Sequence, residues 1–168
     1  LDRSSAASDV YKRQLKFIDQ EYLSHFDARN VYSAVKTQSP LPKRKIVEAP
    51  FGISENESLE KKTIHALYIA LNDHITTEES LAFKILSYVL VDMDGAPLKK
   101  AVLDAGIGND VSSAYGDSYK QPVWTIEVTG SEIDKREKFI STVDLVLRNL
   151  ALDGIDRNML EAALNRTE

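Results

Sequence analysis

The sequence predicts an α+β two-layer sandwich, in which helices cover one face of a largely antiparallel sheet. Two observations carry this prediction. Residues 63–71 and 121–130 have the alternating apolar pattern of strands, while residues 76–90 and 131–150 have the three-to-four-residue spacing of amphipathic helices. Along the chain, the expected order is strand, strand, helix, short helix, strand, strand, helix, helix.

Composition places the chain among globular proteins with one substantial core. It has 168 residues, of which 43% are hydrophobic and 28% are charged. The net charge of -5 argues against nucleic acid or an anionic membrane as a partner, since both usually require a basic surface. The absence of cysteine excludes disulfides, thiolate zinc sites and cysteine nucleophiles, and it fits a cytoplasmic protein.

The first 45 residues are expected to lie outside the sandwich. Residues 1–14 have no apolar periodicity and no hydrophobic run of the kind that a secretory signal needs, so we expect a non-native leader or a disordered tail. Residues 15–45 are expected to be the tail of a preceding domain and a linker, with a strand or short helix at 15–32. The basic run at 43–45 lacks interleaved aromatic residues, which favours solvated linker over nucleic-acid binding. Both ends of the chain are expected to be truncated, because it lacks an initial methionine and stops within a helical pattern.

Residues 46–168 are expected to form an α+β domain, truncated at its C-terminus. A short strand is predicted at 46–51, and a charged loop at 52–62. In residues 63–71 (TIHALYIAL) both alternating faces are largely apolar. This strand is therefore expected near the middle of the sheet.

Local signals mark the ends of the first two helices. Thr76 and Glu79 form a capping box, which begins a helix that runs to Leu90. Pro97 suits the first turn of a short helix, and Gly106 suits a left-handed cap at its end. A helix of about two turns is marginal in water, so we expect it to be docked on the larger elements.

Two strands and two further helices are expected in the second half. Residues 110–120 and 121–130 form an antiparallel pair, and residues 131–150 form an amphipathic helix. The inner stripe expected for this helix consists of Ile133, Ile140, Val143, Leu147 and Leu150. Asp156 is expected to cap a last helix. The inner stripe of the last helix begins with Leu160, Ala163 and Leu164.

The residues themselves identify no catalytic centre. The three histidines, His25, His65 and His74, lie in neither His-x-x-Glu-His nor His-Glu-x-x-His, so no metal site is expected in this segment. A Gly-x-Ser-x-Gly nucleophile elbow is also missing. Residues 106–108 (GIG) follow a helix and precede a strand, the reverse of a dinucleotide-binding context, and are expected to form a tight turn.

Several segments, taken in order, resemble one peptidase family. They are residues 22–27 (YLSHFD), 95–108 (GAPLKKAVLDAGIG), 121–122 (QP), 154–156 (GID) and 161–168 (EAALNRTE). Together they resemble the presequence-protease branch of the insulinase (pitrilysin) zinc peptidases, a similarity that runs from about residue 15 to the end.

This resemblance implies a zinc metalloendopeptidase of homologous α+β domains that surround a chamber and degrade unfolded peptides. The zinc ligands and the glutamate base would come from the first domain, whereas this chain matches the second domain and the tail of the first. No catalytic residue and no metal ligand can be carried over to this segment. The implied partners are a peptide substrate and the remaining domains of the same polypeptide. The alternative is a catalytically silent scaffold of the same fold.

The resemblance also implies a candidate substrate-binding strand. In the insulin-degrading branch, an edge strand of the second domain anchors the end of the substrate by strand addition. The matching residues here are Ser112, Ser113, Ala114 and Tyr115, and they carry neither the charge nor the proline that would blunt an edge. The alternative is an ordinary polar strand that is paired on both sides.

Overall fold

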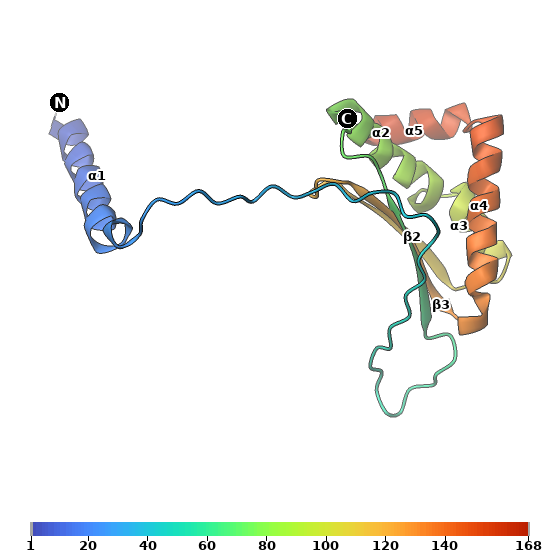
Figure 1. Ribbon diagram of the computed structural model, residues 1–168. Helices are drawn as coiled ribbons and strands as arrows, with labels where there is room; N and C mark the ends of the chain where they lie inside the picture. The colour runs from blue at the N-terminus through green and yellow to red at the C-terminus, as the bar shows by residue number, and fades with distance from the viewer. Residues whose placement is uncertain (1, 168) are drawn as a thin grey trace. The chain divides into compact units, whose positions relative to one another are not determined.

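The computed structural model describes residues 2–167, with side chains over residues 9–166, and the chain divides into two compact units. The first unit, Leu1–Val35, contains helix α1 (Asp2–Glu21) and the 3-10 turn η1 (Leu23–His25), as Figure 1 shows. Helix α1 includes most of the segment for which a non-native leader or a disordered tail was expected.

Helix α1 crosses the boundary that was expected at residue 14. Tyr11, Leu15, Ile18 and, just after the helix, Tyr22 are spaced four, three and four residues apart. A boundary at residue 14 separates Tyr11 from the other three residues, so neither part alone shows the helical spacing. No glycine or proline interrupts the segment, which also favours a helix. The four side chains are exposed in this unit.

The second unit, Lys36–Glu168, is a three-stranded antiparallel sheet with helices on one face, which confirms the predicted α+β class (Figure 1). Its strands β1 (Thr63–Ala70), β2 (Asp110–Gly116) and β3 (Val123–Ser131) lie in the order β1-β3-β2. The predicted antiparallel pairing of β2 with β3 is confirmed.

Two predictions about strands are wrong. Residues 46–51 form no strand in the part of the chain that the structure describes, and β1 is an edge strand rather than a central one. Only one face of β1 packs against the helices, since Ile64 and Tyr68 on its other face are 47% and 68% exposed. The central position belongs to β3, whose alternate residues Trp124 and Ile126 are buried beneath the helices.

The first helix of this unit has the predicted cap. In front of α2 (Thr77–Ser87), Thr76 Oγ1 accepts the N–H of Glu79 at 3.2 Å, and the Glu79 carboxylate accepts the N–H of Thr76 at 2.8 Å. Beyond Ser87 the chain continues as a π-helical turn, η2 (Tyr88–Asp92). The widened turn directs the last residue of η2 toward β2, where it contacts Ser113.

The short helix α3 (Pro97–Asp104) is also confirmed, together with the reason for its end. Gly106 has a φ of +63°, and its N–H donates to the Leu103 carbonyl at 2.9 Å. The N–H of Ile107 donates to the Val102 carbonyl at 3.2 Å. These two bonds form a Schellman motif, for which a left-handed glycine is the preferred residue.

The last two helices, α4 (Arg136–Asp153) and α5 (Arg157–Thr167), follow the 3-10 turn η3 (Ile133–Lys135). The predicted cap on α5 is confirmed, because Asp156 Oδ1 accepts the N–H groups of Asn158 and Met159. The expected inner stripes are only partly right. Ile133 is 73% exposed and Leu164 is 45% exposed, whereas Phe139 is 2% exposed. The helix begins after Ile133, so Phe139 and Val143 face the sheet.

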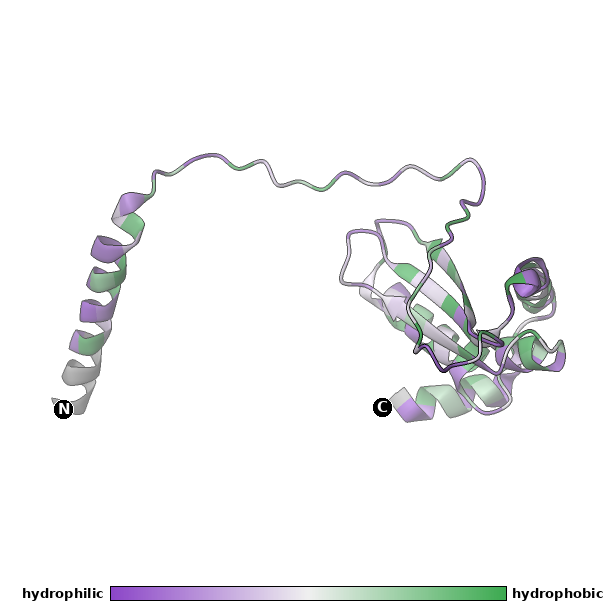
Figure 2. Cartoon of the chain, turned by 90° about the horizontal axis from the view of Figure 1, so that it is seen from below, coloured by the Kyte–Doolittle hydropathy of each residue, from purple (hydrophilic) through white to green (hydrophobic). Residues whose placement is uncertain are grey.

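The core lies between the sheet and the helices. Its buried residues come from all three strands, from η2, α3 and α4, and from the turn after α3. They are Leu67, Leu90, Val91, Leu98, Val102, Ile107, Val111, Trp124, Ile126, Val128, Phe139 and Val143. Figure 2 shows apolar and polar residues alternating along the strands, as a sheet with one covered face requires. Among the described residues, no helix has both the length and the apolar character to cross a membrane.

Candidate functional site

Strand β2 forms one edge of the sheet. It pairs with β3 on one side and with no other strand among residues 2–167. A peptide could therefore approach its other side without displacing a strand of the described chain. The four predicted substrate-binding residues, Ser112, Ser113, Ala114 and Tyr115, all lie on this edge strand.

The four predicted site residues do not share one surface. Ser112 and Ala114 are exposed on the open face of the sheet, whereas Ser113 and Tyr115 turn toward the helices and are partly buried. Side chains alternate between the two faces of any strand, so four consecutive residues cannot all contact one partner from the same side. Their main-chain N–H and C=O groups, unlike their side chains, point along the plane of the sheet.

The main-chain groups of Val111, Ser113 and Tyr115 line the free edge. The Ser113 N–H donates to Asp92 Oδ1 at 3.2 Å, and it therefore points away from β3. In an antiparallel strand, these groups point alternately toward and away from the partner. Those of Val111 and Tyr115 consequently point to the same side as those of Ser113.

A chain of polar contacts connects the centre of this edge to the core. Trp124 Nε1–H donates to Ser87 Oγ at 3.0 Å, and Ser87 Oγ lies 2.6 Å from Ser113 Oγ. The Ser113 hydroxyl donates to Asp92 Oδ2, with 2.7 Å between the two oxygens, and Ser113 Oγ lies 3.3 Å from the Ser87 carbonyl oxygen. The contacts join β3, α2, β2 and η2. Nothing in the local sequence pattern indicates that Ser87 and Asp92 take part, because their partners lie 21 to 37 residues away.

A second polar cluster lies at the end of β2. The Tyr115 ring stacks on Phe83 with 5.7 Å between centroids, and its hydroxyl donates to Ser80 Oγ at 3.3 Å. Lys84 Nζ lies 2.6 Å from Asp117 Oδ2. The hydrogen bond from Lys84, together with one from Ser80, holds the pKa of the Asp117 carboxyl below its usual value. These contacts hold the end of β2 against α2, beside a cavity of about 460 Å³.

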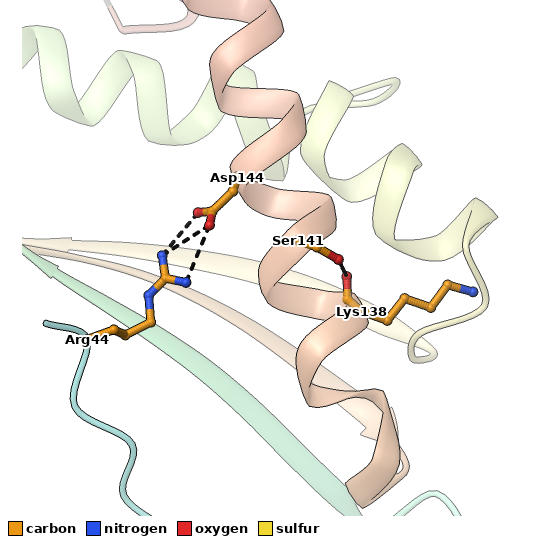
Figure 3. Close-up of polar contacts among 4 residues, drawn as sticks. All are labelled: Arg44, Lys138, Ser141 and Asp144. Carbon is orange, nitrogen blue, oxygen red and sulfur yellow. Dashed lines mark hydrogen bonds and ion pairs between the residues drawn. The ribbon is translucent and has the colours of Figure 1, made fainter.

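A larger groove, of about 1240 Å³, follows the other edge of the sheet beside β1. Residues 41–51 form one wall, and the start of α4 contributes to another. The Arg44 guanidinium donates to both carboxylate oxygens of Asp144 at 3.1 to 3.4 Å, as Figure 3 shows. On the same helix, Ser141 Oγ donates to the Lys138 carbonyl at 3.0 Å (Figure 3). The basic run that was expected to be solvated linker thus contributes a tether to α4 through Arg44.

The described residues do not fit a zinc site. Among the side chains of residues 9–166, no three of the metal-binding types His, Cys, Asp and Glu gather around one point. His65 Nε2 lies 2.9 Å from the carbonyl oxygen of Glu132, so that nitrogen already has a main-chain partner. His74 Nε2 lies 3.4 Å from Asp73 on an exposed loop. The zinc that the resemblance implies would therefore require ligands from outside this segment.

Comparisons with known proteins point to one family. The sequence pattern of the peptidase M16 inactive domain matches residues 6–167. Protein HypA from Clostridium perfringens is 38% identical over 157 residues, which cover 94% of this chain and 16% of that protein. The mitochondrial presequence protease of Schizosaccharomyces pombe is 29% identical over 99 residues, 58% of this chain and 10% of that protein. Presequence protease 1, chloroplastic/mitochondrial, from Arabidopsis thaliana is 26% identical over 156 residues, 88% of this chain and 14% of that protein. The chain thus spans at most 16% of the length of these three relatives.

Proposed function

The chain belongs to the peptidase M16 family, and from this premise we propose that it is a non-catalytic segment of a zinc metalloendopeptidase that degrades unfolded peptides. The match to the family's inactive domain over residues 6–167 carries the proposal, and relatives named presequence protease support it. In this proposal the segment is part of the wall of a peptide-degrading chamber. The zinc ligands and the catalytic base come from other parts of the longer protein.

The family resemblance expected from the sequence is confirmed, but a scaffold of the same fold is a second candidate function. The description of the matching domain as inactive fits both. Sequencing the complete reading frame in the source DNA distinguishes them. We expect a His-x-x-Glu-His motif upstream of residue 15 for the peptidase, whereas a complete frame with that motif lost or degraded would identify a scaffold.

We further propose that β2 captures peptide substrate by strand addition. The main-chain groups of Val111, Ser113 and Tyr115 face away from β3, which gives an incoming strand a row of hydrogen-bonding positions. Such bonds bind an extended peptide with little dependence on its sequence. Ser112 and Ala114 are small and uncharged, so they leave the adjacent open face accessible.

Replacing Ser113 by proline tests this capture. Proline removes the outward N–H but no hydrogen bond to β3, because the Ser113 N–H donates to Asp92. In the full-length protein, we expect Ser113→Pro to weaken the binding of an unfolded peptide about tenfold, the effect of one lost hydrogen bond. Binding is measured by fluorescence anisotropy with a labelled peptide, and the zinc content should be unchanged.

Ser113→Ala is the matched control for this substitution. It removes the same hydroxyl from the contacts with Ser87 and Asp92 but keeps the main-chain N–H. Peptide binding no weaker than that of the unchanged protein is expected for Ser113→Ala, because the main-chain N–H is kept. Equal peptide affinities of the alanine and proline variants would argue against strand addition at β2.

The remaining domains of the same polypeptide are the other proposed partners. The unpaired edge of β1 and its groove are surfaces on which such domains could pack. We propose neither nucleic acid nor a membrane as a partner, in keeping with the net charge of -5. A cytoplasmic location is proposed on the absence of cysteine.

A further inference from the structure

A carboxylate already occupies the centre of the free β2 edge. Asp92 accepts the Ser113 N–H at Oδ1, 3.2 Å away, and the Ser113 hydroxyl at Oδ2, 2.7 Å away. Both oxygens of one side chain therefore contact one residue of the strand. The Ser113 N–H is also the group that a peptide carbonyl would need if a strand were added here.

The helical region before Asp92 explains why this carboxylate reaches the strand. Asp92 ends the π-helical turn η2, in which the N–H of the next residue, Met93, donates to the Tyr88 carbonyl at 2.9 Å. Val89 and Val91 in this turn are fully buried, so the turn is anchored in the core. The buried turn thus positions an otherwise exposed side chain against β2.

The direction of the hydrogen bonds strengthens this contact. Trp124 Nε1 can only donate, and Asp92 as a carboxylate can only accept. Both requirements are met when each group donates to the next. Trp124 Nε1–H donates to Ser87 Oγ, the Ser87 hydroxyl donates to Ser113 Oγ, and the Ser113 hydroxyl donates to Asp92 Oδ2. Consecutive hydrogen bonds of this kind polarise one another, and the last one is strengthened by the charge of its acceptor.

We infer that Asp92 competes with bound peptide for the Ser113 N–H and thereby limits strand addition at β2. This inference rests on the proposed capture of peptide by that edge. An incoming strand must replace the carboxylate by one of its own carbonyl groups, so the energy of the Asp92 contact is subtracted from the binding energy. Asp92 therefore keeps the edge closed to weakly binding chains and sets the affinity for those that do bind.

Replacing Asp92 by alanine in the full 168-residue chain tests the competition with two readouts. Hydrogen exchange of the Ser113 amide, followed by NMR, reports on the contact itself. Fluorescence anisotropy with a labelled extended peptide that has no ionisable side chains reports on capture. We expect Asp92→Ala to accelerate exchange and to tighten peptide binding, each about tenfold.

Two further variants make the result specific. Asp94→Ala removes an equal charge from a neighbouring exposed residue, and it should change neither the Ser113 exchange rate nor the peptide affinity. Asp92→Asn retains the size of the side chain with a neutral, weaker acceptor, so its two effects should be intermediate. It also provides a test if the alanine variant does not fold.

The outcomes separate this inference from the proposed function. Unchanged exchange in both Asp92 variants would overturn the competition. Faster exchange without tighter peptide binding would also overturn it, and Ser113→Pro then identifies the cause. If Ser113→Pro still weakens binding, only the role of Asp92 is wrong; if it has no effect, peptide capture at β2 is wrong as well.

Discussion

Leu98→Ala is expected to lower the free energy of unfolding by about 2–5 kcal/mol, the usual range for leucine truncation in a packed core. Leu98 is 0% exposed and lies on the inner face of α3, the shortest α-helix of the second unit. Short helices have little stability of their own, so α3 depends on this contact with the rest of the core. Urea denaturation followed by circular dichroism measures the change.

Leu152→Ala is the matched control for the core substitution. Leu152 also lies on a helix, but it is 84% exposed. Its replacement should change the free energy of unfolding by no more than about 0.5 kcal/mol. Similar losses for the two variants would show that α3 does not dock on the core as described.

Gly108→Ala is expected to destabilise the protein by about 1–3 kcal/mol, because a methyl group does not fit between the turn and β3. A Cβ atom at Gly108 would lie 2.4 Å from Val128 Cγ2 and 2.6 Å from the Thr129 carbonyl oxygen. The Val128 side chain could rotate, but the carbonyl belongs to the central strand and can move only with its backbone. The thermal midpoint and the urea midpoint should both fall.

Gly52→Ala serves as the control for this prediction. No heavy atom lies within 4 Å of a Cβ built at Gly52, and the residue is exposed. This variant should retain the stability of the unchanged protein. Gly108→Ala with unaltered midpoints would refute the close approach between residue 108 and β3.

The two glycines of the 106–108 turn differ in what determines them, one local and the other a distant strand. Gly106 ends α3 with a positive φ, as its place after the apolar stripe predicts. Gly108 has another purpose, since it makes room for β3 some 20 residues further along the chain. The sequence predicted the turn and excluded a dinucleotide-binding loop, but the close approach depends on a distant strand.

In the candidate site, too, some features follow from the local sequence and others depend on distant segments. The strand at 111–115 could be predicted from its position in the chain and its resemblance to relatives. The resemblance implied an edge position, but the sequence left open an ordinary strand that is paired on both sides. The strand order β1-β3-β2 decides between the two. The contact between Asp92 and Ser113 was also hidden, since it depends on a π-helical turn 21 residues earlier in the chain.

The sequence by itself determined the fold class, the family and the helix ends at Thr76, Pro97, Gly106 and Asp156. Each of these ends depends on hydrogen bonds or backbone angles within one turn of the chain, so nearby residues suffice to predict them. Only the tertiary structure decided the strand order, the buried residues of α4 and the contact of Asp92 with Ser113 on the β2 edge. These features depend on packing between segments far apart in the sequence, where several arrangements satisfy the same apolar pattern and the best-packed one prevails.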